Sequence, residues 1–179
     1  MKKAAVFLDR DGTINFDSGY VSSPADLKIF PAALRGLKLL SEKGFSLFIV
    51  TNQSGLARGY FSENDLDDIH RRLLGDLKRE GITIDEIAVC PHHPDEGCNC
   101  RKPSPLLVRR LANRHGLDLR RSFFVGDKLT DIRTGINAGC RTVLITPPDS
   151  RQQAEGEEKP DYVAADLEEA ARWIIGLKD

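Results

Sequence analysis

Apolar residues along this chain fall into two patterns that alternate from one end to the other. Short runs in which apolar residues predominate, each long enough for one strand, cover residues 4–8, 45–50, 84–89, 122–125, 139–145 and 161–163. Between them lie stretches with apolar residues at helical spacing, often bounded by proline, serine or glycine, at residues 31–43, 62–80, 104–115 and 166–178. The alternation predicts an α/β fold in which helices cover a mainly parallel sheet.

Four of the predicted strands are followed closely by residues whose side chains can take part in catalysis or bind a metal or phosphate. Asp9 and Asp11 follow the first strand, Thr51 the second, Cys90 the third and Asp127 the fourth. Taken alone, each change from apolar to polar is an ordinary strand-to-turn junction. Because the carboxyl ends of parallel strands meet at one edge of a sheet, however, one crevice there can gather all four clusters. This convergence predicts a functional site.

The first cluster has the character of a cation site. Asp9 and Asp11 are separated by a single residue, so their side chains can point the same way if the strand persists. Two like charges this close repel each other unless a cation lies between them. Oxygen ligands on a tight turn suit Mg²⁺, and Gly12 allows the chain to turn sharply there.

Residues 90–100 form a second candidate metal site. Three cysteines and two histidines occur in these eleven residues, and the prolines and glycine among them predict a loop. Three thiolates and one imidazole suit a closed, tetrahedral structural Zn²⁺ site, which we assign to Cys90, His92, Cys98 and Cys100. His93 stays open as the alternative to His92, because spacing alone does not separate them. A disulfide is the other interpretation of the clustered cysteines.

A basic pair follows the last of these cysteines. Arg101 and Lys102 offer the two ways in which proteins neutralise phosphate, a fork and a point charge. A solvated surface pair is the usual meaning of Arg-Lys. Attachment to a loop fixed by zinc would instead hold both cations in place, so we expect them to bind phosphate.

Composition and charge narrow the class of protein further. The chain has 179 residues, which suits one domain spanning residues 1–179 that includes the zinc loop. A formal net charge of −1 indicates no nucleic-acid partner and no anionic membrane surface. No apolar run is long enough to span a bilayer, and the run after the basic N-terminus is too short for a signal peptide. We therefore expect a cytoplasmic location, where clustered cysteines favour metal binding over disulfides.

Together these motifs resemble those of the haloacid-dehalogenase-like (HAD) phosphatases. They are most similar to the branch of heptose 1,7-bisphosphate 7-phosphatases, and the histidinol-phosphate phosphatases are a related branch that shares the zinc loop. The matching residues are 7–15, 17–20, 51–59, the zinc loop with Arg101-Lys102-Pro103, and 126–128. The resemblance implies a Rossmann-like three-layer sandwich without a large cap domain.

The resemblance also implies a role for each residue of the site. Asp9 would be the nucleophile, Asp11 the general acid/base, Thr51 and Lys102 the groups that stabilise the phosphoryl group, and Arg101 a substrate contact. The Mg²⁺ ligands would be Asp9, Asp127 and Asp11, the last usually through its backbone carbonyl, while Asp131 would orient Lys128 or a metal-bound water. The substrate-binding residues would be Asp17, Ser18, Gly19, Tyr20, Thr51, Asn52, Gln53, Ser54, Arg58, Arg101, Lys102 and Lys128.

The expected activity is Mg²⁺-dependent removal of the 7-phosphate of D-glycero-D-manno-heptose 1,7-bisphosphate through an aspartyl-phosphate. The resemblance places this step in bacterial heptose biosynthesis, for the lipopolysaccharide core or for nucleotide-activated heptose, with a small sugar bisphosphate as partner and a monomer as the working form. Histidinol phosphate is the alternative substrate, favoured by the short spacing of five residues between His92 and Cys98. A zinc-stabilised binding module without activity is the alternative of another class, although both Asp9 and Asp11 are present. A phosphoryl transferase or mutase would be expected to carry a larger cap.

Overall fold

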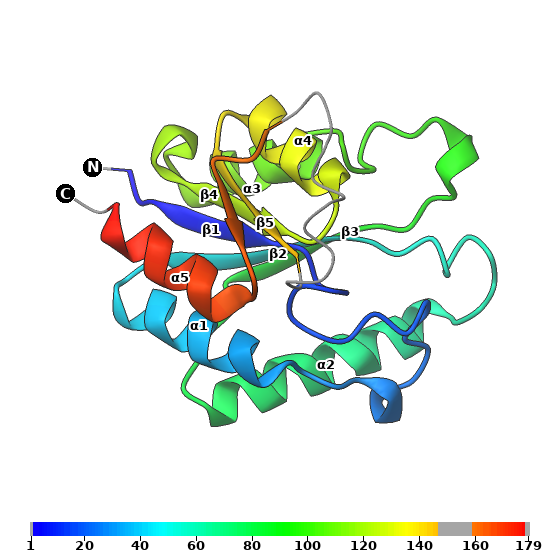
Figure 1. Ribbon diagram of the computed structural model, residues 1–179. Coiled ribbons are helices and arrows are strands. Elements are labelled where there is room, and N and C mark those ends of the chain that lie inside the picture. The colour runs from blue at the N-terminus through cyan, green and yellow to red at the C-terminus, as the bar shows by residue number, and fades with distance from the viewer. Residues whose placement is uncertain (1, 147–158, 178–179) are drawn as a thin grey trace.

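One six-stranded sheet organises the chain (Figure 1). The computed structural model describes residues 2–146 and 159–177. The strands lie in the order β3-β2-β1-β4-β5-β6, and every neighbouring pair is parallel. Their bounds are β1 Ala5–Leu8, β2 Ser46–Asn52, β3 Glu86–Cys90, β4 Phe123–Gly126, β5 Arg141–Ile145 and β6 Tyr162–Ala164. The predicted parallel α/β sheet is confirmed.

The strand order determines where a ligand can bind. The chain winds outward from β1 through β2 to β3, and then crosses back to place β4 on the other side of β1. Neighbouring connections therefore leave β1 and β4 in opposite directions, which opens a crevice at the carboxyl ends of these two strands. The site described below lies at this point.

Helices cover both faces of the sheet, so the architecture is a three-layer sandwich. In Figure 1, α1, α2 and α5 lie on one face and α3 and α4 on the other. Within the described residues, no segment forms a separate cap domain. The bounds are α1 Pro31–Glu42, α2 Glu63–Arg79, α3 Leu106–His115, α4 Leu129–Ala138 and α5 Leu167–Gly176, with short 3₁₀ helices at Pro24–Asp26, Pro94–Glu96 and Leu119–Arg121.

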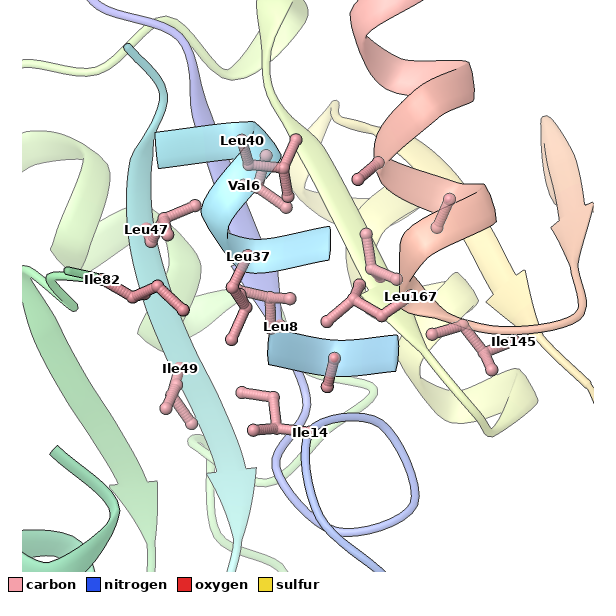
Figure 2. Packing of buried hydrophobic residues seen from close by; sticks show 14 of the residues in the cluster. Val6, Leu8, Ile14, Leu37, Leu40, Leu47, Ile49, Ile82, Ile145 and Leu167 are labelled. Carbon is pink, nitrogen blue, oxygen red and sulfur yellow. The ribbon is translucent and has the colours of Figure 1, made fainter. Parts of the chain in front are cut away.

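The central strand contributes to both cores because its side chains alternate between the faces. Val6 and Leu8 pack toward α1 and α5, together with Leu37 and Leu167 (Figure 2). Phe7 points the other way and stacks on Phe48 at 5.5 Å between ring centroids. All four residues of β1 are fully buried. A strand this deeply buried is a rigid base for the two aspartates that follow it.

The predicted boundaries differ from the observed ones in places that have a local cause. The second strand was predicted to end at residue 50, but β2 continues through Asn52, because β3 pairs with it as far as Cys90. The third helix was predicted from residue 104, but α3 begins at Leu106 after Pro105, and the Ser104 hydroxyl accepts from the backbone N–H of Leu106. The sequence Ser62-x-x-Asp65 before a helical stretch predicts a capping box, and the structure confirms it at the start of α2.

Two further expectations concern chain segments rather than the sheet. The Pro-, Glu- and Gln-rich stretch of residues 146–160 predicts an exposed loop. It falls almost wholly on residues 147–158, which lie outside the described residues. None of the helices in the described part of the chain has the length and apolar character that crossing a bilayer needs.

Candidate active site and zinc-binding loop

Three carboxylates converge at the crevice between β1 and β4. Asp9 follows β1, Asp127 follows β4, and Asp131 lies in the first turn of α4; one carboxylate oxygen of each lies within 4.8 Å of the others. Gly12 makes this approach possible, because a Cβ there would lie 2.3 Å from Oδ2 of Asp127 and its φ is +84°. Gly12 is therefore required for two reasons: a side chain there would collide with Asp127, and the backbone adopts a left-handed conformation.

Lys102 reaches into this cluster from the far end of the zinc loop. Its Nζ lies 2.7 Å from Oδ1 of Asp9 and 2.6 Å from Oδ1 of Asp131, and its side chain is buried. Burial alone would lower the pKa of Lys102, but Asp131 and Asp9 raise it, so the ammonium stays charged. The predicted phosphate-binding cation is therefore part of the carboxylate cluster.

The cluster fits a divalent cation. Burial, opposed by Lys102 and reinforced by Asp131 and Asp127, raises the pKa of Asp9 to about 7. Burial also raises the pKa of Asp127, whose buried Oδ1 has no hydrogen-bond partner among the described residues. Three carboxylates face Lys102 in direct contact with two of them and Lys128 nearby, so negative charge is still in excess. Oxygen donors with this excess suit Mg²⁺.

The Asp11 carboxylate does not join this cluster. It accepts hydrogen bonds from Nε (3.1 Å) and Nη2 (2.8 Å) of Arg10, from Nδ2 of Asn15 (2.9 Å) and from Nε2 of Gln53 (2.9 Å). Burial acts to raise the pKa of Asp11, but the Arg10 cation and these hydrogen bonds lower it overall. In place of the Asp11 side chain, the carboxylate cluster contains Asp131. A metal contact through the Asp11 backbone carbonyl stays a prediction.

A cleft of about 570 Å³ opens over these groups. Most of the predicted substrate-binding residues line it, together with Val21, Thr130 and Asp131, which were not predicted as substrate contacts. Ser18 and Arg58 are not among the lining residues, so their predicted contact with substrate gains no support. The predicted residues that do line the cleft are Asp9, Asp11, Asp17, Gly19, Tyr20, Thr51, Asn52, Gln53, Ser54, Arg101, Lys102 and Lys128.

Some of these lining residues hold the site together. The Asn52 amide faces the backbone of Lys102, accepting from its N–H at 3.1 Å and donating to its carbonyl at 3.5 Å. Gln53 donates to the Thr51 hydroxyl at 2.8 Å as well as to Asp11. Both amides were predicted to contact substrate, and both also have a positioning role that depends on contacts far apart in sequence.

Lys128 bridges the two sides of the cleft. Its Nζ donates to Oδ2 of Asp17 at 3.2 Å, and its backbone N–H donates to Oδ2 of Asp131 at 3.1 Å. Burial would lower the pKa of Lys128, but Asp127 and Asp17 raise it. The expectation that Asp131 orients Lys128 therefore has a direct contact behind it, through the backbone.

The predicted zinc ligands lie together at the end of β3. The ligand atoms of Cys90, His92, Cys98 and Cys100 lie within 4.8 Å of one another, with pair distances from 3.1 to 3.8 Å where they touch. Sulfur atoms around a tetrahedral zinc are roughly 3.8 Å apart, given Zn–S bonds of about 2.3 Å. A disulfide needs about 2.05 Å between sulfurs, and all four cysteines are free. The residues fit zinc and exclude the disulfide interpretation.

The structure also separates the two histidines. Nδ1 of His92 lies 3.2 Å from Sγ of Cys100 and 3.6 Å from Sγ of Cys90. His93 instead caps the short helix Pro94–Glu96, where its Nδ1 accepts from the backbone N–H of Asp95. The cluster therefore contains His92, as assigned from the sequence.

Comparison with known proteins identifies the class of hydrolase to which the chain is similar. A family model described as HAD-hydrolase-like matches residues 99–170. The chain is 38% identical to the D-glycero-β-D-manno-heptose-1,7-bisphosphate 7-phosphatase of Haemophilus ducreyi, over 97% of this chain and all of that protein. It is 42% identical to the protein of the same name from Helicobacter pylori strain J99, over 79% of this chain and 82% of that one.

A solved structure supports the same family. The D,D-heptose 1,7-bisphosphate phosphatase of B. bronchiseptica, complexed with magnesium and phosphate, superposes with a TM-score of 0.90 at 36% identity, covering 98% of this chain and 99% of that one. Within the HAD-like hydrolases, the chain belongs to the family of heptose-1,7-bisphosphate 7-phosphatases.

Proposed function

We propose that this protein is a Mg²⁺-dependent phosphatase that removes the 7-phosphate of D-glycero-β-D-manno-heptose 1,7-bisphosphate. The observation that carries the proposal is the cluster of Asp9, Asp127, Asp131 and Lys102, of which Asp9, Asp131 and Lys102 line the cleft together with Asp11. The names of the relatives supply the substrate, including the β anomer, which the residues do not determine.

Asp9 acts as the nucleophile. One of its carboxylate oxygens forms a bond to phosphorus while the bond from phosphorus to the sugar O7 breaks, giving an aspartyl-phosphate and splitting one difficult step into two. The Lys102 ammonium lies against Asp9 and offsets the repulsion between the anionic nucleophile and the anionic phosphate. When bound among the three carboxylates, Mg²⁺ supplies further positive charge of the same kind.

Asp11 moves the protons. It lines the cleft with about a fifth of its side chain exposed, so a leaving oxygen can reach it. In the free protein its donors favour the carboxylate, and the negative charge of a bound phosphate favours the protonated form. Asp11 then donates its proton to the sugar O7 and, in the second step, takes one from the water that attacks the aspartyl-phosphate.

Zinc has a structural role in this proposal. Four protein ligands leave no open position for water or substrate. The zinc loop leads directly to Arg101 and Lys102, and Nη1 of Arg101 donates to the carbonyl of His92 at 3.4 Å. Zinc therefore holds the segment that presents both cations to the cleft.

Histidinol phosphate is kept as the second candidate substrate, because the spacing of five residues between His92 and Cys98 matches that branch. An inactive binding module is disfavoured, because both Asp9 and Asp11 line the cleft. We further propose that the chain works as a single-domain monomer in the cytoplasm, where its four free cysteines stay reduced and three of them bind zinc.

The identity of the product tests the proposal. The protein would be incubated with the β-1,7-bisphosphate and Mg²⁺, and the products followed by phosphorus NMR. We expect one inorganic phosphate per sugar, with the 1-phosphate signal retained and the 7-phosphate signal lost. Loss of the 1-phosphate, or no release of phosphate, contradicts the proposal.

A further inference from the structure

A buried chain of contacts links α2 to the general acid/base and has no part in the mechanism above. Arg10 lies between Asp9 and Asp11 in sequence, and its side chain is among the largest that are fully buried in the described residues. Its Nε and Nη2 form a fork to the two oxygens of Asp11, and its Nη1 lies 3.0 Å from Nε2 of His70. His70 stands 60 residues away in sequence.

The chemistry of the Arg10–His70 contact assigns donor and acceptor. A guanidinium has only donors, so Nε2 of His70 must accept and the ring must be neutral with its proton on Nδ1. Burial and the Arg10 cation lower the pKa of His70 to about 4, in agreement with a neutral ring. His70 is therefore a fixed acceptor for Arg10, and it makes no ion pair with it.

This acceptor fixes the direction of the fork. A guanidinium is planar, so holding Nη1 at His70 while Nε and Nη2 bind Asp11 leaves the plane no freedom to rotate. The Asp11 carboxylate then has its plane set by Arg10, with Asn15 and Gln53 completing the four hydrogen bonds. Proton transfer depends steeply on such placement, because a displacement of about 1 Å can cost on the order of a hundredfold in rate.

We propose that Arg10, anchored by the buried acceptor His70, is a positioning residue that holds Asp11 in place for both proton transfers. The inference rests on the proposed role of Asp11. A purely structural role for the Arg10–His70 contact would affect every substrate alike. Positioning of an acid instead lowers kcat/KM, which reports formation of the aspartyl-phosphate, only for substrates whose leaving group needs a proton.

Two variants with the same amide group at different side-chain lengths test the acceptor. In His70→Gln the amide oxygen reaches the place of Nε2, while in His70→Asn the shorter side chain does not. Each variant would be assayed for kcat/KM with heptose 1,7-bisphosphate, whose sugar alkoxide needs a proton, and with 4-nitrophenyl phosphate, whose leaving phenolate does not. Thermal unfolding of each variant checks the fold, and Arg10→Lys, which keeps the charge and loses the fork, is the second variant.

We expect His70→Asn and Arg10→Lys to lower kcat/KM for the sugar bisphosphate by about 30-fold or more, and for 4-nitrophenyl phosphate by about threefold or less. His70→Gln should stay within about threefold of the wild-type value on both. With 4-nitrophenyl phosphate the impaired variants should also show a burst of about one phenolate per enzyme, because the water step that Asp11 assists becomes limiting.

Equal losses on the two substrates, or a His70→Gln variant as impaired on the sugar substrate as His70→Asn, would overturn the inference. If His70→Asn does not fold, the inference is judged on Arg10→Lys, from its loss of kcat/KM with the sugar bisphosphate relative to its loss with 4-nitrophenyl phosphate. Failure of the proposed function is read separately, since it requires that the wild-type protein fail to hydrolyse the heptose bisphosphate.

Discussion

The electrostatics of a few buried residues define the site. Asp9, Asp127 and Asp131 are brought together against the repulsion of their charges, and Lys102 balances only part of it. Burial raises the pKa values of Asp9 and Asp127, so removing a cation leaves these groups in an unfavourable environment. The same side chains therefore affect both activity and stability, so thermal unfolding of their variants can test the assigned cation site.

The first prediction concerns the nucleophile. Asp9→Asn should lower turnover of the heptose bisphosphate by at least about a thousandfold, because the amide cannot form the phosphoenzyme. The fold should be intact, since the substitution keeps the shape and removes one of three crowded charges. Phosphate release and thermal unfolding are the two measurements. A folded Asp9→Asn protein with substantial turnover would refute covalent catalysis.

The second prediction concerns Asp127 and the cation. Mg²⁺ should raise the melting temperature of the wild-type protein, because it binds the folded state through the carboxylate cluster. Asp127→Asn should melt at a higher temperature than wild type without Mg²⁺, since one half-buried charge of the crowded cluster is gone, and Mg²⁺ should raise that temperature much less. An equal Mg²⁺-dependent shift in both proteins would place the cation elsewhere.

At the scale of the elements, the zinc loop connects the end of β3 to Lys102 in the carboxylate cluster. It leaves β3 at Cys90, whose carbonyl accepts from the backbone N–H of Gln53 at 2.8 Å, and it ends at Lys102, which the Asn52 amide holds. Both attachments lie at or just beyond the end of β2. Loss of zinc should therefore displace Lys102 from Asp9 without breaking the sheet.

The two neighbouring histidines test this role. His92→Ala should lower zinc content and also lower stability and turnover, because the loop loses a ligand and its cations lose their support. His93→Ala is the matched control and should keep about one zinc per chain, because His93 only caps a short helix. Added Mg²⁺ should not restore His92→Ala. Zinc retained in His92→Ala and lost in His93→Ala would reverse the assignment.

The packing of α1 on α5 supplies a prediction about stability alone. A Cβ on Gly36 of α1 would lie 2.4 Å from the backbone carbonyl oxygen of Leu167, so Gly36→Ala must push the two helices apart. We expect a loss of about 1–3 kcal/mol in the free energy of unfolding. Gly75→Ala in α2 meets nothing within 4 Å and should stabilise by up to about 1 kcal/mol. Denaturant unfolding of both variants measures the difference, and equal effects would contradict the packing.

What the sequence predicted well follows from local rules. The alternation of strands and helices, the capping box at Ser62 and the four zinc ligands each depend on residues close together in the chain. The contacts of Asp11 are of a different kind. His70 is a lone histidine on α2, and no pattern around it indicates that the fold brings it to Arg10. The entry of the Asp131 carboxylate into the cluster is of the same kind, since the placement of α4 decides it.

At the scale of the whole molecule, the sheet order turns scattered motifs into one site. Because β1 lies between β2 and β4, the residues that follow these strands meet at one edge, and the zinc loop after β3 returns Lys102 to the same place. This convergence was predictable from strand–helix alternation alone. The shape of the cleft was not, because it depends on how the segments around Tyr20 and Ser54 pack over that edge.

Substrate preference tests the central claim most directly. Initial rates of phosphate release would be measured for D-glycero-β-D-manno-heptose 1,7-bisphosphate and for histidinol phosphate with Mg²⁺, using zinc-loaded protein. The account predicts a kcat/KM at least about a hundredfold higher for the heptose bisphosphate, since its second phosphate can meet Arg101 and Lys128 in the cleft. Equal values, or a preference for histidinol phosphate, would contradict it.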